Sequence, residues 1–249
     1  MNLFFGGYDK AIEKIFSTTT ARKKVTIFTP NAEMLAAAKK RKRLLSLLKT
    51  AALPFPDGIG VYIAARMIGY VPKERTNGID LAERILNEAA TRKMGVFLLG
   101  GRPGIAEAAA KKLSERFDGI IISGTHHGYF DKIGSKNDDV IKRIDRSGAE
   151  VLFVCFGFPT QERWIADNIH KLKSVKIAAG LGGSLDVWSG KLRRAPKLFR
   201  ALGIEWLWRV ACEPSRIRRI PSVFKFILHC LAGKMAKSAK RKSNLLQNR

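Results

Sequence analysis

Apolar and polar positions alternate in a regular order over most of the chain. Short apolar segments rich in Val, Ile and Phe are followed by turns containing Gly, Pro or Asn, and then by segments with a helical pattern. Such strand–turn–helix units with near-continuous apolar strands predict an α/β fold, in which helices flank a Rossmann-like, mostly parallel sheet on both faces. The expected strands lie within residues 24–29, 95–100, 119–130, 149–159 and 175–183.

Helical patterns follow these strands, and the turns between them hold the first candidate site residues. Helices are expected at 32–49, directly after Asp57, and at 105–117, 136–147 and 160–172. Ligands of open parallel sheets bind beyond the carboxyl ends of the strands. The residues expected there are Thr29, Asn31, Gly101, Gly157, Gln161 and Gly182.

The pattern changes near residue 195, where helical segments separated by prolines replace the strand–turn–helix units. Residues 191–249 contain 16 Lys and Arg but only two acids. We therefore expect two parts: an α/β core at residues 1–195 and a basic helical appendage at residues 196–249.

The whole 249-residue chain is strongly basic, since 46 Lys and Arg against 21 Asp and Glu give a net charge of +25. A globular enzyme does not need this charge to fold, so it indicates an anionic partner such as nucleic acid, anionic lipid or a phosphorylated substrate. The first residues lack the apolar core of a signal peptide, and no apolar run reaches the roughly 18–20 residues that span a bilayer. Three cysteines without metal-ligand spacing, with Cys155 in an apolar run, fit a buried thiol and a reducing cytoplasm.

Gly100 and Gly101 end one expected strand and open the next helix, in LLGGRPGIAEAAAKKL. Such a turn exposes backbone N–H groups at a helix N-terminus, where phosphate binds. A tight strand-to-helix turn with positive φ needs the same glycines. The turn is not a full G-x-G-x-x-G, and Gly119–Thr125 holds no acid that could bind a ribose, which argues against a nicotinamide cofactor.

A second glycine turn, Gly180–Gly183, precedes Asp186. This carboxylate can accept a hydrogen bond from a base or a sugar hydroxyl, or it can cap the next helix. Gln161 lies in the first turn of the helix after Pro159, within reach of a sugar or phosphate, while Thr160 beside it is typical of a plain N-cap. The residues by themselves leave these alternatives open.

Arg209, Arg216 and Arg219 are spaced seven and three residues apart, which places them on one helix face if the path stays helical through Pro214. Three guanidinium groups on one face match a diphosphate. A solvated basic face has the same pattern. Trp206 nearby is typical either of a core residue or of an aromatic anchor at a membrane interface.

Two further patterns bear on nucleic acids and metals. The basic run Lys39–Lys49 has no zinc spacing or nucleic-acid-binding motif beside it, so a helix face near anionic lipid is the favoured interpretation. His126 and His127 have no Cys or acid partner at ligand spacing, and no D-x-D motif occurs, so no metal site is expected. A nucleotide-sugar enzyme of this kind would neutralise its diphosphate with arginine.

Seven motifs occur together in a fixed order: TPNAEML, PDGIGVYIAARMIG, NGIDL, LLGGRPGIAE, GFPTQE, GLGGSLDVWSGKLRRAP and GIEWLWRVACEPSRIRR. Their combination over residues 25–220 resembles the WecG/TagA/CpsF family of bacterial glycosyltransferases. The resemblance implies an inverting transfer that needs neither metal nor cofactor. It implies a UDP-activated N-acetylmannosamine or its uronic acid as donor. The acceptor it implies is an N-acetylglucosamine linked through diphosphate to a polyprenol, in teichoic acid or cell-surface polysaccharide synthesis.

The resemblance also implies roles for particular residues. Asp57 of the PDG motif matches the general base, which takes the acceptor hydroxyl proton. The implied pocket residues are Thr29, Asn31, Arg75 and Gln161, the implied diphosphate ligands are Arg209, Arg216 and Arg219, and weaker nucleotide-site candidates are Asp186, Gly100 and Gly101. The basic appendage would dock on an anionic membrane and close over the site, which implies a cytoplasmic enzyme peripheral on the inner face of the plasma membrane.

Asp57 lies between Pro56 and Gly58, a position that also suits a helix cap. We expect the uncharged helix after it to be buried behind the carboxylate. Two alternative functions share the fold class: a nucleic-acid-binding protein, which the net charge allows, and a nicotinamide-dependent oxidoreductase, which the missing ribose acid argues against. We expect no nucleic-acid partner, and both a monomer and a homo-oligomer are compatible with the sequence.

Overall fold

The structure is a computed structural model of the whole chain. It describes residues 1–20, 23–212, 214, 217, 221, 223–232 and 234. Two residues predicted to bind the diphosphate, Arg216 and Arg219, lie outside the described residues, and the side chain of Arg209 does too.

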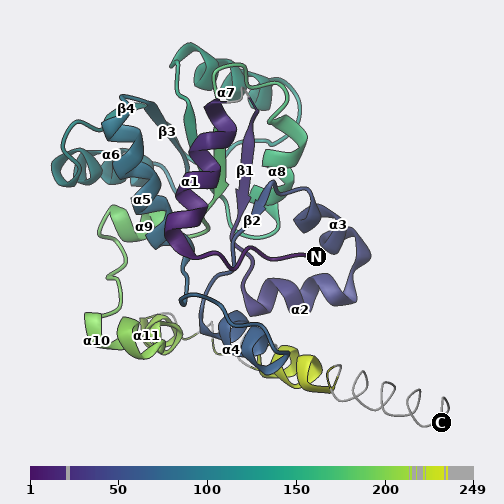
Figure 1. The fold of residues 1–249 in the computed structure, drawn as a ribbon. Helices are drawn as coiled ribbons and strands as arrows, with labels where there is room; N and C mark the ends of the chain where they lie inside the picture. Colours follow the sequence, from purple (N-terminus) through teal and green to yellow (C-terminus); the bar gives the residue numbers. More distant parts are fainter. Residues whose placement is uncertain are drawn as a thin grey trace, which may run out of the picture.

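A six-stranded sheet with only parallel pairing forms the centre of the molecule, in the order β2-β1-β6-β5-β3-β4 (Figure 1). This confirms the predicted α/β fold with a Rossmann-like parallel sheet. The strands are β1 (Val25–Phe28), β2 (Leu53–Pro54), β3 (Gly95–Gly100), β4 (Ile121–His126), β5 (Val151–Cys155) and β6 (Ile177–Gly180).

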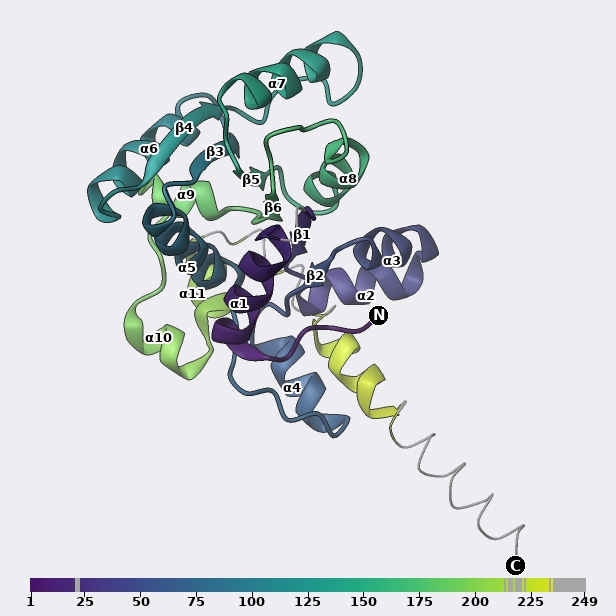
Figure 2. The ribbon, with the colours of Figure 1, turned by 45° about the horizontal axis from the view of Figure 1, so that its top comes forward.

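Helices cover both faces of the sheet, because its inner strands carry apolar side chains on each face (Figure 2). In β3, Val96 and Leu98 pack on one side, and Phe97 and Leu99 pack on the other. The first side is covered by α1 (Gly7–Thr20), α5 (Gly78–Thr91), α6 (Ile105–Arg116) and α9 (Ser184–Trp188), and the second by α2 (Ala32–Lys40), α3 (Lys42–Lys49), α7 (Ser135–Arg146) and α8 (Thr160–Asn168).

The single helix predicted over residues 32–49 is instead two helices, α2 and α3. Arg41 has an extended backbone, with φ −129° and ψ 102°, and it separates them. The five consecutive cations at residues 39–43 are all exposed, whereas Leu44 and Leu48 are buried. A continuous helix would have turned part of this charged segment toward the core, and the break avoids that burial.

Three helices lie at the edge of the sheet where the strands end: α4 (Ile59–Met67), α10 (Lys197–Leu202) and α11 (Glu205–Cys212). Residues 223–232 form a further helix near α4. The expectation that the helix after Asp57 is buried holds only on one face, since Ala64 and Ala65 are buried but Ile63 is 39% exposed. Within the part of the chain that the structure describes, no helix is long and apolar enough to cross a membrane.

One carboxylate is completely buried against the sheet. Glu162, in the first turn of α8, has no exposed surface. Its Oε1 accepts a hydrogen bond of 2.9 Å from Gln161 Nε2, and its Oε2 has no hydrogen-bond partner among the described residues. Burial raises the pKa of Glu162 above its usual value, because the charged form loses its hydration.

We predict that Glu162→Gln stabilises the protein more at pH 7.5 than at pH 4.5. Because the pKa of Glu162 is higher in the folded protein, the unfolded chain releases this proton at lower pH than the folded protein does. Ionisation of Glu162 therefore lowers the free energy of unfolding of wild type as the pH rises, whereas the neutral amide of Gln has no such effect. Each kcal/mol of difference corresponds to about 2–4 °C in Tm for a chain of this size. Circular dichroism melts at both pH values measure the change.

Glu115→Gln is the matched control, because Glu115 is exposed on α6. The difference in Tm between Glu115→Gln and wild type should be the same at both pH values. A Tm difference between Glu162→Gln and wild type that does not change with pH would contradict the raised pKa of Glu162.

Candidate active site

The topology of the sheet creates a crevice between β3 and β5. The connection after β3 leads to the edge strand β4, whereas the connection after β5 leads the opposite way, to β6. Crevices of this kind, at the carboxyl ends of strands whose connections diverge, are the usual binding sites of open parallel sheets. A cavity of about 630 Å³ lies there, which we call the basic cavity.

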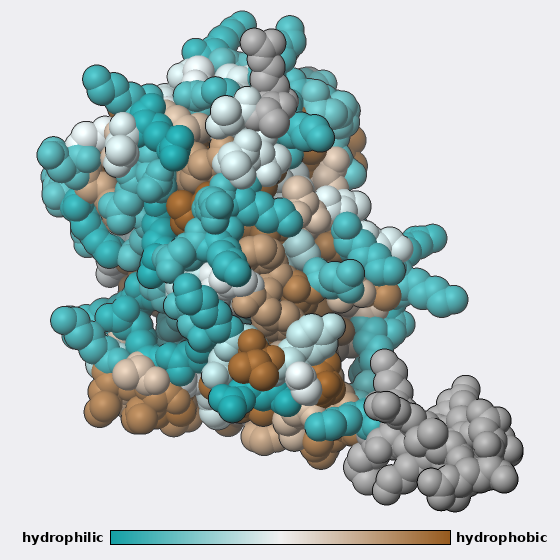
Figure 3. Space-filling view, viewed as in Figure 1, coloured by the Kyte–Doolittle hydropathy of each residue, from teal (hydrophilic) through white to brown (hydrophobic). Residues whose placement is uncertain are grey.

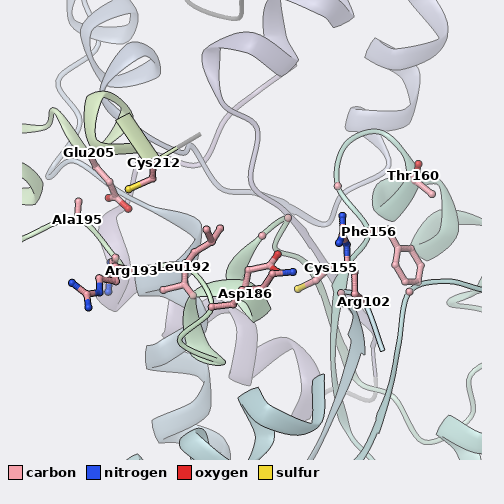
Figure 4. Close-up of a pocket in the computed structure, with 18 of the residues that line it drawn as sticks. Arg102, Cys155, Phe156, Thr160, Asp186, Leu192, Arg193, Ala195, Glu205 and Cys212 are labelled. Carbon is pink, nitrogen blue, oxygen red and sulfur yellow. The ribbon is translucent and has the colours of Figure 1, made fainter. Parts of the chain in front are cut away.

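The basic cavity is lined by more cations than acids. Figure 4 shows Arg102 and Phe156 on one side, Glu205 and Cys212 of α11 on the other, and Asp186 between them. Its charged lining residues are Arg102, Lys132, Lys191, Arg193 and Arg194, together with Asp186 and Glu205. Such a site favours an anionic ligand with a polar group that can reach a carboxylate.

The first glycine turn is required by the backbone and also contributes to the cavity. Gly100 has φ 142°, and a Cβ there would overlap the carbonyl group of Cys155 on the neighbouring strand. Gly101 has φ 69° and lines the basic cavity. The tight-turn interpretation is therefore correct on geometry, and phosphate binding at this turn stays a prediction.

Lys132 supports the opposite wall of the basic cavity, and sequence reasoning did not single it out. Its ammonium group donates to the carbonyl oxygens of Gly128, at 2.6 Å, and Phe130, at 2.7 Å. The same group lies 3.7 Å from the ring centroid of Phe130 and 4.4 Å from that of Phe156. Burial lowers the pKa of Lys132. Lys132 follows β4 in a loop that contains no recognisable motif, so its position in the cavity wall could not be predicted from the sequence.

Gln161 joins two turns at the carboxyl edge. Its Oε1 accepts hydrogen bonds from Gly157 N, at 3.2 Å, and Gly182 N, at 2.8 Å. The residue is only 3% exposed, so its side chain fixes the backbone around the basic cavity. Thr160 is not the N-cap of α8, because Pro159 occupies that position without a side-chain cap.

Asp186 lies in the first turn of α9, where Gly183 is the N-cap residue. It lines the basic cavity, and its Oδ1 is 3.9 Å from Lys191 Nζ. The capping alternative is therefore wrong for Asp186, and its carboxylate faces the cavity in Figure 4. Cys155, in the same wall, is buried as expected, and burial raises the pKa of its thiol to about 12.

A second cavity, of about 620 Å³, lies beside the basic cavity between the core and the C-terminal helices. We call it the apolar cleft, because Ile, Val, Leu, Phe and Trp are the largest group among its lining residues. It brings together four of the predicted site residues: Thr29, Asn31, Asp57 and Arg75.

Asp57 is held at the start of α5, far along the chain from its own position. Its Oδ1 accepts a hydrogen bond of 3.0 Å from Gly78 N, and its own N–H donates to Pro30 O. The helix after Asp57, α4, has Gly58 at its N-cap without a side-chain cap. Asp57 therefore binds the N-terminus of α5 rather than that of α4, and this contact fixes the orientation of its carboxylate.

The two polar residues after β1 are also tied to the framework. Thr29 Oγ1 donates to Gly180 O at 3.1 Å, and Asn31 Oδ1 accepts from Met34 N at 3.0 Å, which makes Asn31 the N-cap of α2. Both residues line the apolar cleft near Asp57. Their positions are consequently fixed by the sheet and by a helix N-terminus.

Arg75 links the core to the C-terminal helices. Its guanidinium group donates to the carbonyl oxygens of Arg200 and Ala201, the latter at 3.2 Å. These carbonyls lie at the C-terminal end of α10, where the helix dipole favours a cation. Arg75 lines the apolar cleft as well, so it holds α10 in place at the mouth of the predicted pocket.

Two adjoining cavities thus contain six of the predicted site residues, with Thr29, Asn31, Asp57 and Arg75 in the apolar cleft and Gly101 and Asp186 in the basic cavity. Gly100 and Gln161 line neither cavity, and Glu205 of α11 lines both. Trp206 lines the apolar cleft and is 41% exposed, so it is not a core residue. The described residues contain no group of three or more His, Cys, Asp or Glu that could hold a metal ion. The rings of His126 and His127 pack against each other, with centroids 4.5 Å apart.

Comparison with known proteins identifies the family. The family model described as "Glycosyl transferase WecG/TagA/CpsF family" matches residues 5–240. The N-acetylglucosaminyldiphosphoundecaprenol N-acetyl-beta-D-mannosaminyltransferases of Staphylococcus aureus strains MRSA252 and NCTC 8325 are each 35% identical over 229 residues, which cover 92% of this chain and 86% of the relative. The chain therefore belongs to the WecG/TagA/CpsF family of glycosyl transferases, and it is a hexosyltransferase.

Proposed function

We propose that this glycosyltransferase moves N-acetylmannosamine, or its uronic acid, from a UDP-sugar to an N-acetylglucosamine linked through diphosphate to a polyprenol. The S. aureus relatives carry a name that specifies this acceptor and an N-acetylmannosaminyl group. The observation that carries the proposal is the pair of adjoining cavities of different polarity, which share Glu205 as a lining residue.

The basic cavity suits the nucleotide diphosphate of the donor. Its cations offset the charge of the diphosphate, and the turn at Gly101 brings backbone close to the ligand. The carboxylate of Asp186 is placed to accept a hydrogen bond from a sugar hydroxyl or a base. The transferred sugar would then lie toward Glu205, between the two cavities.

Asp57 suits the role of general base for an acceptor in the apolar cleft. In an inverting transfer, the acceptor hydroxyl attacks C1 of the donor sugar from the face opposite UDP, the C1–O bond to UDP breaks, and the carboxylate takes the hydroxyl proton. One carboxylate is sufficient because no covalent intermediate forms. Cationic side chains stabilise the charge that develops on the leaving diphosphate, so no step requires a metal ion.

The C-terminal helices complete the site in this proposal. The side chains of α11 line both cavities, and Arg75 holds α10 against the core. Arg209, Arg216 and Arg219 remain the proposed diphosphate ligands. Membrane contact would bring the appendage into place, since each basic residue near an anionic surface contributes roughly 1 kcal/mol to docking.

Asp57→Asn is expected to lower kcat by about 10²–10⁴-fold, because the amide cannot accept the proton. Its Oδ1 can still accept the hydrogen bond from Gly78 N, so the fold and UDP affinity should be retained. UDP release with the acceptor measures the rate, and Asp118→Asn, on the exposed turn after α6, is the control. Wild-type kcat in Asp57→Asn would exclude Asp57 as the base.

UDP is expected to raise the Tm without magnesium, since a ligand at 100 times its Kd stabilises the native state by about 2.7 kcal/mol. NAD and duplex DNA should give no shift. Arg102→Ala should reduce the UDP shift because Arg102 lines the basic cavity, whereas Arg146→Ala, on the exposed end of α7, should not. Stabilisation by NAD or DNA instead of UDP would overturn the donor assignment.

Removal of residues 196–249 is expected to abolish transfer while the α/β core stays folded. The deletion removes α11 from both cavities and the partners of Arg75 on α10, but it leaves every strand of the sheet. Circular dichroism tests the fold, and UDP release tests activity. Full activity in the shortened protein would disprove the proposed role of the appendage.

A further inference from the structure

The wall of the apolar cleft is more apolar than a sugar and a diphosphate require. Three helices contribute to it, each with two residues four positions apart, so each helix turns one face toward the cleft. These pairs are Ile59 and Ile63 on α4, Trp206 and Val210 on α11, and Val223 and Ile227 on the helix at 223–232.

The apolar wall extends from the neighbourhood of Asp57 to the surface. Ile59 follows Asp57 by two residues, and one helical turn later Ile63 is 39% exposed. Phe224, which also lines the cleft, is 59% exposed. Figure 3 shows hydrophobic surface gathered at the same edge of the molecule, over α4 and α10. The cleft is therefore an apolar path that begins at the proposed base and opens at the surface.

Close packing between two helices forms one side of this path. A Cβ at Gly60 would lie 2.9 Å from Ala32 Cβ and 3.2 Å from Val223 Cγ1. The absence of a side chain at Gly60 lets α4 approach both α2 and the helix at 223–232. The C-terminal helix thereby covers α4 beside the cleft instead of standing away from it.

We infer that the apolar cleft binds the isoprenoid units next to the diphosphate of the acceptor lipid. This inference rests on the proposed function. An isoprenoid chain that reached Asp57 through water would expose apolar surface, whereas the cleft removes that surface from water at a gain of about 25 cal/mol per Å². The cleft is thus an acceptor lipid site, separate from the basic cavity and from any contact with the bilayer.

Acceptors of different chain length test the inference without a membrane. N-acetylglucosamine diphosphates carrying C5, C10 and C15 isoprenoid chains are assayed below their micelle concentrations, with neither vesicles nor detergent. The expected result is a KM that falls on the order of tenfold with each added isoprene unit until the cleft is filled, with kcat little changed. The ratio of KM for the C5 acceptor to KM for the C15 acceptor is the quantity compared between variants.

Ile63→Ser and Phe224→Ser should each lower this KM ratio at least threefold, because they replace apolar wall with hydroxyl groups. Ile133→Ser is the matched control: Ile133 is 87% exposed before α7 and does not line the cleft. Thermal melts establish that each variant is folded. An unchanged ratio in both cleft variants would overturn the inference.

Fluorescence gives a readout that does not depend on transfer. Binding of the C15 acceptor without donor should shift the emission of Trp206 to shorter wavelength, and Trp206→Phe should remove the shift. Transfer with a KM independent of chain length, and no fluorescence shift, would overturn the lipid site but leave the proposed function. A shift without transfer to any of the acceptors would support the lipid site and contradict the proposed reaction.

Discussion

The parallel pairing of β1, β6, β5 and β3 is the constraint on which both cavities depend. It places the ends of four strands at one edge, so that turns far apart in sequence become neighbours. Gln161 then fixes two of these turns with a single buried amide oxygen. Thr29 fixes a third by donating to Gly180 O. Side chains that face a ligand from this edge are therefore held by the sheet itself.

The C-terminal helices cover this edge of the sheet. Two cavities of different polarity lie between these helices and the sheet. The basic cavity lies over the crevice between β3 and β5, and the apolar cleft lies over β1 and the start of α5. Glu205 contributes to both, so α11 forms the boundary between them. The proposed reaction, which joins a charged nucleotide sugar to a lipid-linked sugar, needs a polar and an apolar site next to each other.

Arg75 shows how the same residue can serve the fold and the site. Its guanidinium group binds two carbonyl oxygens at the end of α10, about 125 residues away in the chain. This contact keeps α10 and the following α11 close to the core. A substrate in the apolar cleft would therefore meet a wall whose position depends on Arg75.

The sequence by itself determined five of the six strands, the two glycine turns and the family, because these depend on local periodicity, backbone sterics and short motifs. The short edge strand β2 (Leu53–Pro54) was not predicted, since two residues are too few to show a periodic pattern. It also identified Asp57, but not its partner. Tertiary structure decided that Asp57 binds the N-terminus of α5, that the helix at 32–49 breaks at Arg41, and that Lys132 supports the basic cavity. It also decided the division into two cavities. These features arise from contacts between residues distant in sequence, which no local pattern of apolar and polar positions records.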